Sequence, residues 1–169
     1  MPGPWWLAAG TGLLLLAAGI PAFIWWKRNQ QANLFEFAQR EFRLKREHLE
    51  AKFFDIAANS GKPRGLQWIG CDFENDIAYA RDRETGELTA LVGITIRFAA
   101  IEGGGMEEVE AVGNLRAATA VFQFRDRQWR SDGRAIFNLN PAEAIRHFKS
   151  SLEGVLGDQA DPPGRVASK

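Results

Sequence analysis

Residues 88–99, LTALVGITIRFA, carry the clearest structural signal in this chain of 169 residues. Apolar side chains recur at every second position from Leu88 to Phe98, which is the period of a β-strand with one buried face. Residues 77–81 show the same alternation, and the polar stretch DRETG, which ends at Gly86, separates the two runs. We therefore expect the two runs to pair as a β-hairpin.

Further strands are expected on both sides of this hairpin. One strand begins at Leu66 and runs towards Phe73, and a long strand covers 115–125. A turn at Asp126 and Arg127 then reverses the chain into 128–130, and 134–139 continues in the same direction. Hairpin connections of this kind predict an antiparallel sheet of four to five strands.

Two helices are expected to flank the sheet. Residues 30–59 carry an apolar face at helical spacing and opposite charges four residues apart on the outer face. The apolar face consists of Phe35, Ala38, Phe42, Leu49, Phe53 and Ile56, and the charge pairs are Glu36 with Arg40, Glu41 with Lys45, Arg43 with Glu47 and Arg46 with Glu50. A short second helix begins with Asn140 as N-cap, Pro141 and Glu143. Its apolar face, Ile145, Phe148 and Leu152, extends it to Gly154 or Gly157.

This order of elements predicts the α+β class, with helices covering one face of an antiparallel sheet. It resembles the element order of the cystatin-like and nuclear transport factor 2-like folds, in which a curled sheet wraps a long helix. We expect the apolar face of helix 30–59 to dock onto the sheet of its own chain. A coiled coil with a second copy and a helix lying on a membrane surface are the alternatives.

The N-terminal residues 5–26, WWLAAGTGLLLLAAGIPAFIWW, contain no charged side chain. As a helix rising about 1.5 Å per residue, this segment is roughly 33 Å long, enough to cross a bilayer's hydrocarbon core. It predicts a single transmembrane helix after a short tail, 1–4. Its anchor residues are Trp5, Trp6, Trp25 and Trp26 at the headgroup levels, with Gly12, Gly19 and Pro21 inside the span. The alternatives are a cleaved signal peptide, which the aromatic exit disfavours, and a buried helix, which would have a polar face.

Lys27 and Arg28 follow this span directly, and no basic side chain precedes it. Since Lys and Arg beside a span favour the cytoplasmic side, we expect a protein of the cell membrane whose soluble domain, 27–156, is cytoplasmic, with a periplasmic domain as the alternative. The single Cys71 cannot form an internal disulfide, which fits a reducing compartment. Residues 157–169 are expected to be a disordered tail.

Charge and composition exclude several function classes. The chain has 21 basic and 21 acidic side chains, but residues 65–113 hold ten acidic and only three basic ones. Without a basic surface or a recognised motif, nucleic acid is not an expected partner. One Cys and two distant His give no metal-binding spacing, and no cofactor motif is present.

Three groups of residues are candidates for binding. Asp72, Glu74 and Asp76 alternate, but their context does not match the EF-hand pattern, so an exposed acidic strand end is favoured over a cation site. The glycine-rich loop suits a flexible lid or a docking loop for a basic partner, with a solvated connection as the alternative. Its residues are Glu102, Gly103, Gly104, Gly105, Glu107, Glu108 and Glu110. Tyr79 and Trp68 are expected to line a concavity of the sheet.

The sequence contains no nucleophile elbow, zinc motif or dinucleotide fingerprint, which argues against an enzyme. We expect a single-pass membrane-anchored protein whose α+β domain is a non-catalytic interaction or assembly module. It would act at the membrane on a protein partner or on a second copy of the chain. The alternative is a small-ligand-binding or enzymatic domain with a pocket in the curled sheet.

Overall fold

The computed structural model describes residues 5–60, 65–106, 108–109 and 113–155, and for 5–24, 27 and 28 it describes the backbone without side chains. The chain divides into two compact units, Met1–Arg40 and Glu41–Lys169. α1, Trp5–Ser60, is one continuous helix of 56 residues, whereas the sequence predicts separate helices over 5–26 and 30–59. The reason for the difference is that residues 27–29 include neither Gly nor Pro, so nothing in them stops a helix.

Most of the predicted anchor lies outside the described side chains. Trp25 and Trp26 are described, and both are exposed. Trp5, Trp6, Gly12, Gly19 and Pro21 lie outside the described side chains, and the tails 1–4 and 157–169 lie outside the described residues altogether. Within the searched part of the chain, no helix is long and apolar enough to cross a membrane.

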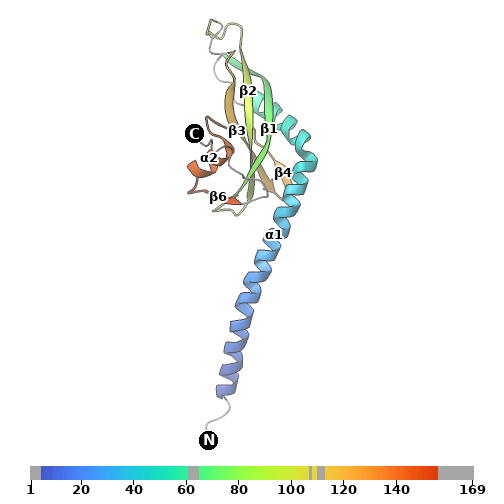
Figure 1. Cartoon of the computed structure of the whole chain (residues 1–169), viewed down its shortest axis with the longest axis vertical. Coiled ribbons are helices and arrows are strands. Elements are labelled where there is room, and N and C mark those ends of the chain that lie inside the picture. Colours follow the sequence, from blue (N-terminus) through green and yellow to red (C-terminus); the bar gives the residue numbers. More distant parts are fainter. Residues whose placement is uncertain (1–4, 61–64, 107, 110–112, 156–169) are drawn as a thin grey trace, which may run out of the picture. The chain divides into compact units, whose positions relative to one another are not determined.

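The described residues form one antiparallel sheet of six strands (Figure 1). Its strands are β1 (Leu66–Asp82), β2 (Leu88–Ala100), β3 (Arg116–Arg125), β4 (Gln128–Arg130), β5 (Ala135–Phe137) and β6 (Leu152–Val155). They lie in the order β4-β3-β2-β1-β6, and β5 pairs with another part of β3. The predicted α+β class and antiparallel sheet are therefore confirmed.

β1 corrects the prediction of two separate strands over 66–73 and 77–81. Phe73 pairs with Ile94 and Ile77 pairs with Val92, so three residues of β1 lie opposite the single residue Gly93 of β2. This bulge, residues 74–76, absorbs the extra length and lets one strand pair with β2 on both sides of it. A second, one-residue irregularity lies at Ile69, between Trp68 and Gly70.

The C-terminal region also differs from its prediction. α2, Pro141–His147, has the predicted capping box between Asn140 and Glu143, but it ends far before Gly154. Residues 152–155 instead form β6, which raises the strand number above the predicted four to five. The free edge of β1 supplies the partner for β6, and long-range pairing of this kind overrides the local helical spacing.

Residues 42–57 of α1 cover one face of the sheet, as predicted for the apolar face of this helix. Phe42 and Phe53 are fully buried, and both of their rings pack against the ring of Phe122 on β3 at 5.3 and 5.6 Å between centroids. Leu49 and Ala57 are also buried, whereas Ile56 is half-buried. The apolar positions of β2 predicted from its alternation, Leu88 to Ile96, are buried beside them.

The opposite face of the sheet has a smaller core, which the sequence does not predict. Leu91 of β2, Ala80 of β1 and Val121 of β3 are buried there against Ala144 of α2, with Leu152 of β6 packed beside them. β2 is therefore buried on both faces in this region. Figure 1 shows α2 and β6 near one end of the long strands, and the loop after β2 at the other end.

The predicted turn at Asp126 and Arg127 is confirmed. Both residues have positive φ, 53° and 59°, and Arg125 pairs with Gln128 across them. A two-residue loop with positive φ at both positions matches the right-handed twist of the strands that it joins.

Candidate interaction surface

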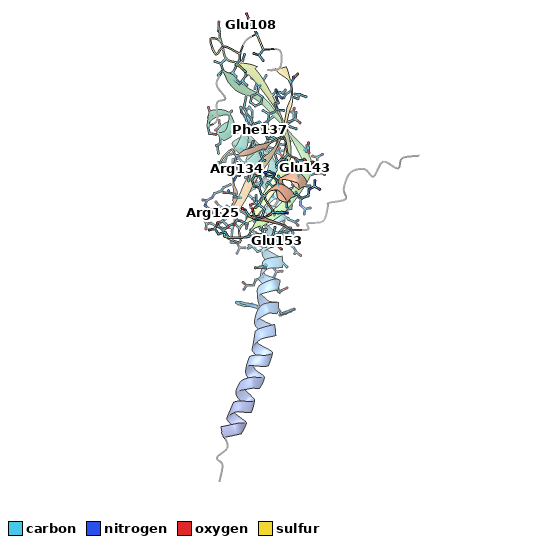
Figure 2. All side chains as sticks on the ribbon, turned by 90° about the vertical axis from the view of Figure 1, so that its left-hand side faces the viewer. Glu108, Arg125, Arg134, Phe137, Glu143 and Glu153 are labelled. Carbon is cyan, nitrogen blue, oxygen red and sulfur yellow. The ribbon has the colours of Figure 1, made fainter. Side chains whose placement is uncertain are left out.

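The glycine-rich loop, residues 101–109, lies at the end of the sheet where β1 begins. Figure 2 shows Glu108 at this end and Glu153 and Arg125 at the other. Glu102 and Glu108 are exposed, whereas Glu107 and Glu110 lie outside the described residues. The loop is attached to the start of β1 because the Ile101 backbone N–H donates to the Gly65 carbonyl at 2.8 Å.

The glycines of this loop have structural reasons to be glycine. A Cβ on Gly104 would lie 2.6 Å from the Gly65 Cα, so the two backbones could not approach each other with larger residues. Gly103 and Gly105 have φ of +76° and +73°, a region that side chains disfavour. Gly104 thus allows the loop to lie against the start of β1, and Gly103 and Gly105 allow its turns.

Tyr79 and Trp68 lie on the face of the sheet that α1 covers, and the structure does not bring them together. The Tyr79 ring is buried and packs against Phe42 and Trp129 at 6.4 and 6.3 Å. Burial raises the pKa of the Tyr79 phenol. Trp68 is half-buried and packs against Phe53 of α1 and Phe98 of β2. Both rings therefore contribute to the aromatic core.

The bulge of β1 is attached to α1 by Arg46. The Arg46 guanidinium donates to the backbone carbonyls of Glu74 and Asn75, the latter at 3.1 Å, and its Nε donates to Glu50 at 2.5 Å. The sequence predicts the pair of Arg46 with Glu50 as part of a solvated helix face. The structure shows it half-buried, linking the helix to the sheet.

The three carboxylates around the bulge do not converge on one point. The Glu74 carboxylate lies against Gly93, where a Cβ would collide with it. Asp72 lies 3.5 Å from the Arg97 guanidinium, and the side chains of Asp72 and Asp76 are exposed. Among the described residues, no group of three His, Cys, Asp or Glu side chains is placed to hold a metal ion.

Cys71 precedes these carboxylates on β1. Burial, together with the nearby charges of Asp72 and Glu50, raises the pKa of its thiol to about 12. At neutral pH the side chain is therefore a thiol rather than a reactive thiolate.

Comparison with known proteins adds no relative from which a site could be transferred. The chain matches no family model, and neither a curated protein nor a solved structure matches it. The arrangement of its own residues must therefore carry any functional argument.

Three features of this end of the sheet escape prediction from the sequence. They are the contact of Arg46 with the bulge, the exposed Ile69 at the second irregularity, and the outer edge of β1. Ile69 does carry a signal, because it follows Trp68 directly and breaks the alternation of the strand. The contact of Arg46 has none, since its partners are backbone atoms far away in the sequence.

Proposed function

We propose that this chain is a single-pass membrane protein whose α+β domain is a non-catalytic interaction or assembly module. Residues 5–26 would be the anchor, and Lys27 and Arg28 favour a cytoplasmic domain. The domain would hold a protein partner at the membrane surface.

The observation that supports this proposal is the filled space between α1 and the sheet. A ligand pocket in a curled sheet would open on this face, but Phe42, Phe53 and Phe122 fill it with fully buried rings. At the end of the sheet with the glycine-rich loop, Ile69 and Leu115 are exposed, as are Glu102 and Glu108, and Leu44 is exposed on α1. A polar surface with isolated apolar side chains is suited to a protein partner.

The test is purification of the tagged full-length protein in a mild neutral detergent, followed by measurement of the mass and stoichiometry of the complex. We expect a second polypeptide in constant ratio. Changing Glu102, Glu107, Glu108 and Glu110 to Gln should release it, and this change leaves Gly104 in place against Gly65. The control is Glu84→Gln, in the turn at the other end of β1. A lone monomer would contradict the proposal.

The topology needs a separate test, and Cys71 is a poor reporter because its thiol is half-buried and protonated. We would place a single cysteine at the exposed Ser150 in a Cys71→Ser background, and another at Gly3 as the matched control. In intact cells, an impermeant maleimide should label the cysteine at position 3 and not the one at position 150. The reverse pattern would place the domain outside.

A further inference from the structure

Within the described residues, the outer edge of β1 has no strand beside it over most of its length. β1 has 17 residues, and β6 pairs only with residues 79–82 on the edge that faces away from β2. Among the described residues, no other strand pairs with this edge (Figure 1). Unpaired strand edges present rows of N–H and C=O groups to which another chain can add.

The register identifies which backbone groups point outwards. The Ile101 backbone N–H donates to the Gly65 carbonyl, so the backbone groups of Gly65 face β2. Because hydrogen-bonding residues alternate along an antiparallel strand, the backbone groups of Gln67, Gly70 and Asp72 also face β2. The outward groups therefore belong to Leu66, Trp68 and Cys71, which lie between these residues, and to Phe73, which follows Asp72. At the bulge, Arg46 already occupies the carbonyls of Glu74 and Asn75. The open edge is thus residues 66–73, about 27 Å of strand at roughly 3.4 Å per residue.

The charge beside this edge selects the partner. Asp72 and Asp76 are exposed near this edge, with Asp72 at 3.5 Å from the Arg97 guanidinium, whereas the Glu74 carboxylate lies against Gly93 of β2. A second copy of β1 would bring its own Asp72 and Asp76 near these carboxylates, and like charges across a strand pair are destabilising. A segment with Lys or Arg at alternate positions would instead meet opposite charge.

Residues 156–169 of the chain itself are a poor occupant of this edge. They contain Asp158 and Asp161, which would meet like charge, and Pro162 and Pro163, which have no backbone N–H to donate.

We propose that the open edge of β1 binds an extended, Lys- or Arg-rich segment of a partner protein by strand addition, next to β6. The backbone groups of residues 66–73 supply the hydrogen bonds, the carboxylates beside the bulge select for positive charge, and the exposed Ile69 offers an apolar contact. This inference deepens the proposed function and rests on it, because it names the class of partner that the module holds.

The experiment measures fluorescence anisotropy with the full-length protein in neutral detergent. The probe is a labelled octapeptide that alternates Lys and Val. One control peptide has Glu in place of Lys, and a second keeps Lys but is N-methylated at every other amide, which removes the donors of one edge. We expect saturable binding of the Lys peptide, no binding of the Glu peptide, and at least tenfold weaker binding of the methylated peptide. Equal binding of the methylated and unmethylated peptides would overturn strand addition, as would no binding of the Lys peptide.

Two pairs of variants locate the binding. Cys71→Pro removes one outward N–H and should weaken the Lys peptide at least fivefold, whereas Cys71→Ala keeps this N–H and should not. Asp72→Asn with Asp76→Asn should also weaken it several-fold, unlike Glu84→Gln at the other end. If Cys71→Pro does not fold, the methylated peptide and the double variant Asp72→Asn with Asp76→Asn still test strand addition at this edge.

Other occupants give different results. If the protein is a homodimer and the double variant Asp72→Asn with Asp76→Asn strengthens the dimer, the occupant is a second copy and the proposal of a basic segment is wrong. If truncation after Val155 increases the affinity for the Lys peptide, the occupant is the chain's own C-terminal segment, and the proposal is also wrong. Loss of peptide binding with an intact co-purified partner would refute this inference alone. Absence of any partner would refute the proposed function, whatever the peptide does.

Discussion

The two ends of β1 differ in how completely they are enclosed. At the closed end, residues 79–82, β1 has β2 on one edge and β6 on the other. Rings on α1 cover one face at Tyr79, and the cluster around Ala144 covers the opposite face at Ala80. At the open edge, residues 66–73, β2 is the one strand of the described chain that pairs with β1, and Gln67, Ile69 and Asp72 are exposed.

This difference assigns different roles to the two ends. Stability should depend on the closed end, because β1 is paired on both edges there and Tyr79 and Ala80 are buried, whereas a change at the open edge should affect binding more than folding. The sheet would thus present a binding edge without losing its core. Mutations that compare the two ends test this division directly.

The largest effect is expected from Phe122→Ala, which removes a ring that contacts both Phe42 and Phe53. We expect a loss of about 3–5 kcal/mol in the free energy of unfolding, because the truncation leaves a cavity in the aromatic core. The matched variant is Ile69→Ala, whose side chain is 57% exposed, with an expected change of about 0.5 kcal/mol or less. Urea denaturation of the full-length protein, followed by tryptophan fluorescence, measures both. Similar losses would break the distinction between the ends.

A smaller effect is expected where the open edge begins. Gly65 and Gly103 have nearly equal φ, +78° and +76°, but a Cβ would lie 2.5 Å from the Gly104 carbonyl oxygen at Gly65 and meet nothing within 4 Å at Gly103. Gly103→Ala should therefore cost about 1–2 kcal/mol for its conformation alone. Gly65→Ala should cost about 1–3 kcal/mol more, because the two backbones must separate. The same denaturation experiment measures the difference, and equal losses would show that the loop does not pack on β1 in solution.

How far the sequence predicts this structure depends on whether a signal is local. The alternation from Leu88 to Phe98, the cap at Asn140 and the turn at Asp126 are all local, and all three are confirmed. β6 is not local, since Leu152 fits a helical face and becomes a strand only because β1 offers an edge 70 residues earlier. The bulge likewise depends on how β2 pairs across it.

The candidate site follows the same rule. Glu102 and Glu108 are exposed, as expected of a polar loop. Residue 104 must be glycine because it lies against Gly65, and no local sequence pattern could predict a contact between residues so far apart in the chain. The aromatic character of Tyr79 and Trp68 fits a pocket lining as well as a core, and only the rings of α1 distinguish the two.

A still smaller effect is expected from the cap of α2 at the closed end. The Asn140 side chain accepts from the Glu143 backbone N–H at 2.8 Å, and the Glu143 carboxylate accepts from the Asn140 N–H at 3.0 Å. Asn140→Ala removes the first bond and should cost about 1 kcal/mol. Asn140→Asp, which keeps an acceptor, is the matched control. If the alanine variant unfolds at the same urea concentration as the wild type, α2 does not contribute to the closed end as described.

The smallest effect concerns pH and the turn that follows the closed end. Backbone hydrogen bonds from Thr85, with further bonds from the Thr85 hydroxyl and the Glu84 N–H, hold the pKa of Asp82 below its ordinary value of 3.8. Hydrogen bonds from the Arg125 guanidinium, at 2.7 and 2.8 Å, hold the pKa of Glu87 below its ordinary value of 4.5. Both carboxylates bind protons more weakly in the folded chain than in the unfolded chain.

The contribution of these two carboxylates is therefore complete above about pH 5 and is lost as the pH falls through their folded pKa values. We expect the urea midpoint to be constant from pH 7 to 5 and to decline below pH 4.5. Asp82→Asn and Glu87→Gln should each flatten part of this decline. Glu84→Gln should leave it steep, because Glu84 contacts Asp82 only through its backbone N–H, which the substitution keeps. A decline that is equally steep in all three variants would mean that the acid sensitivity arises away from the closed end.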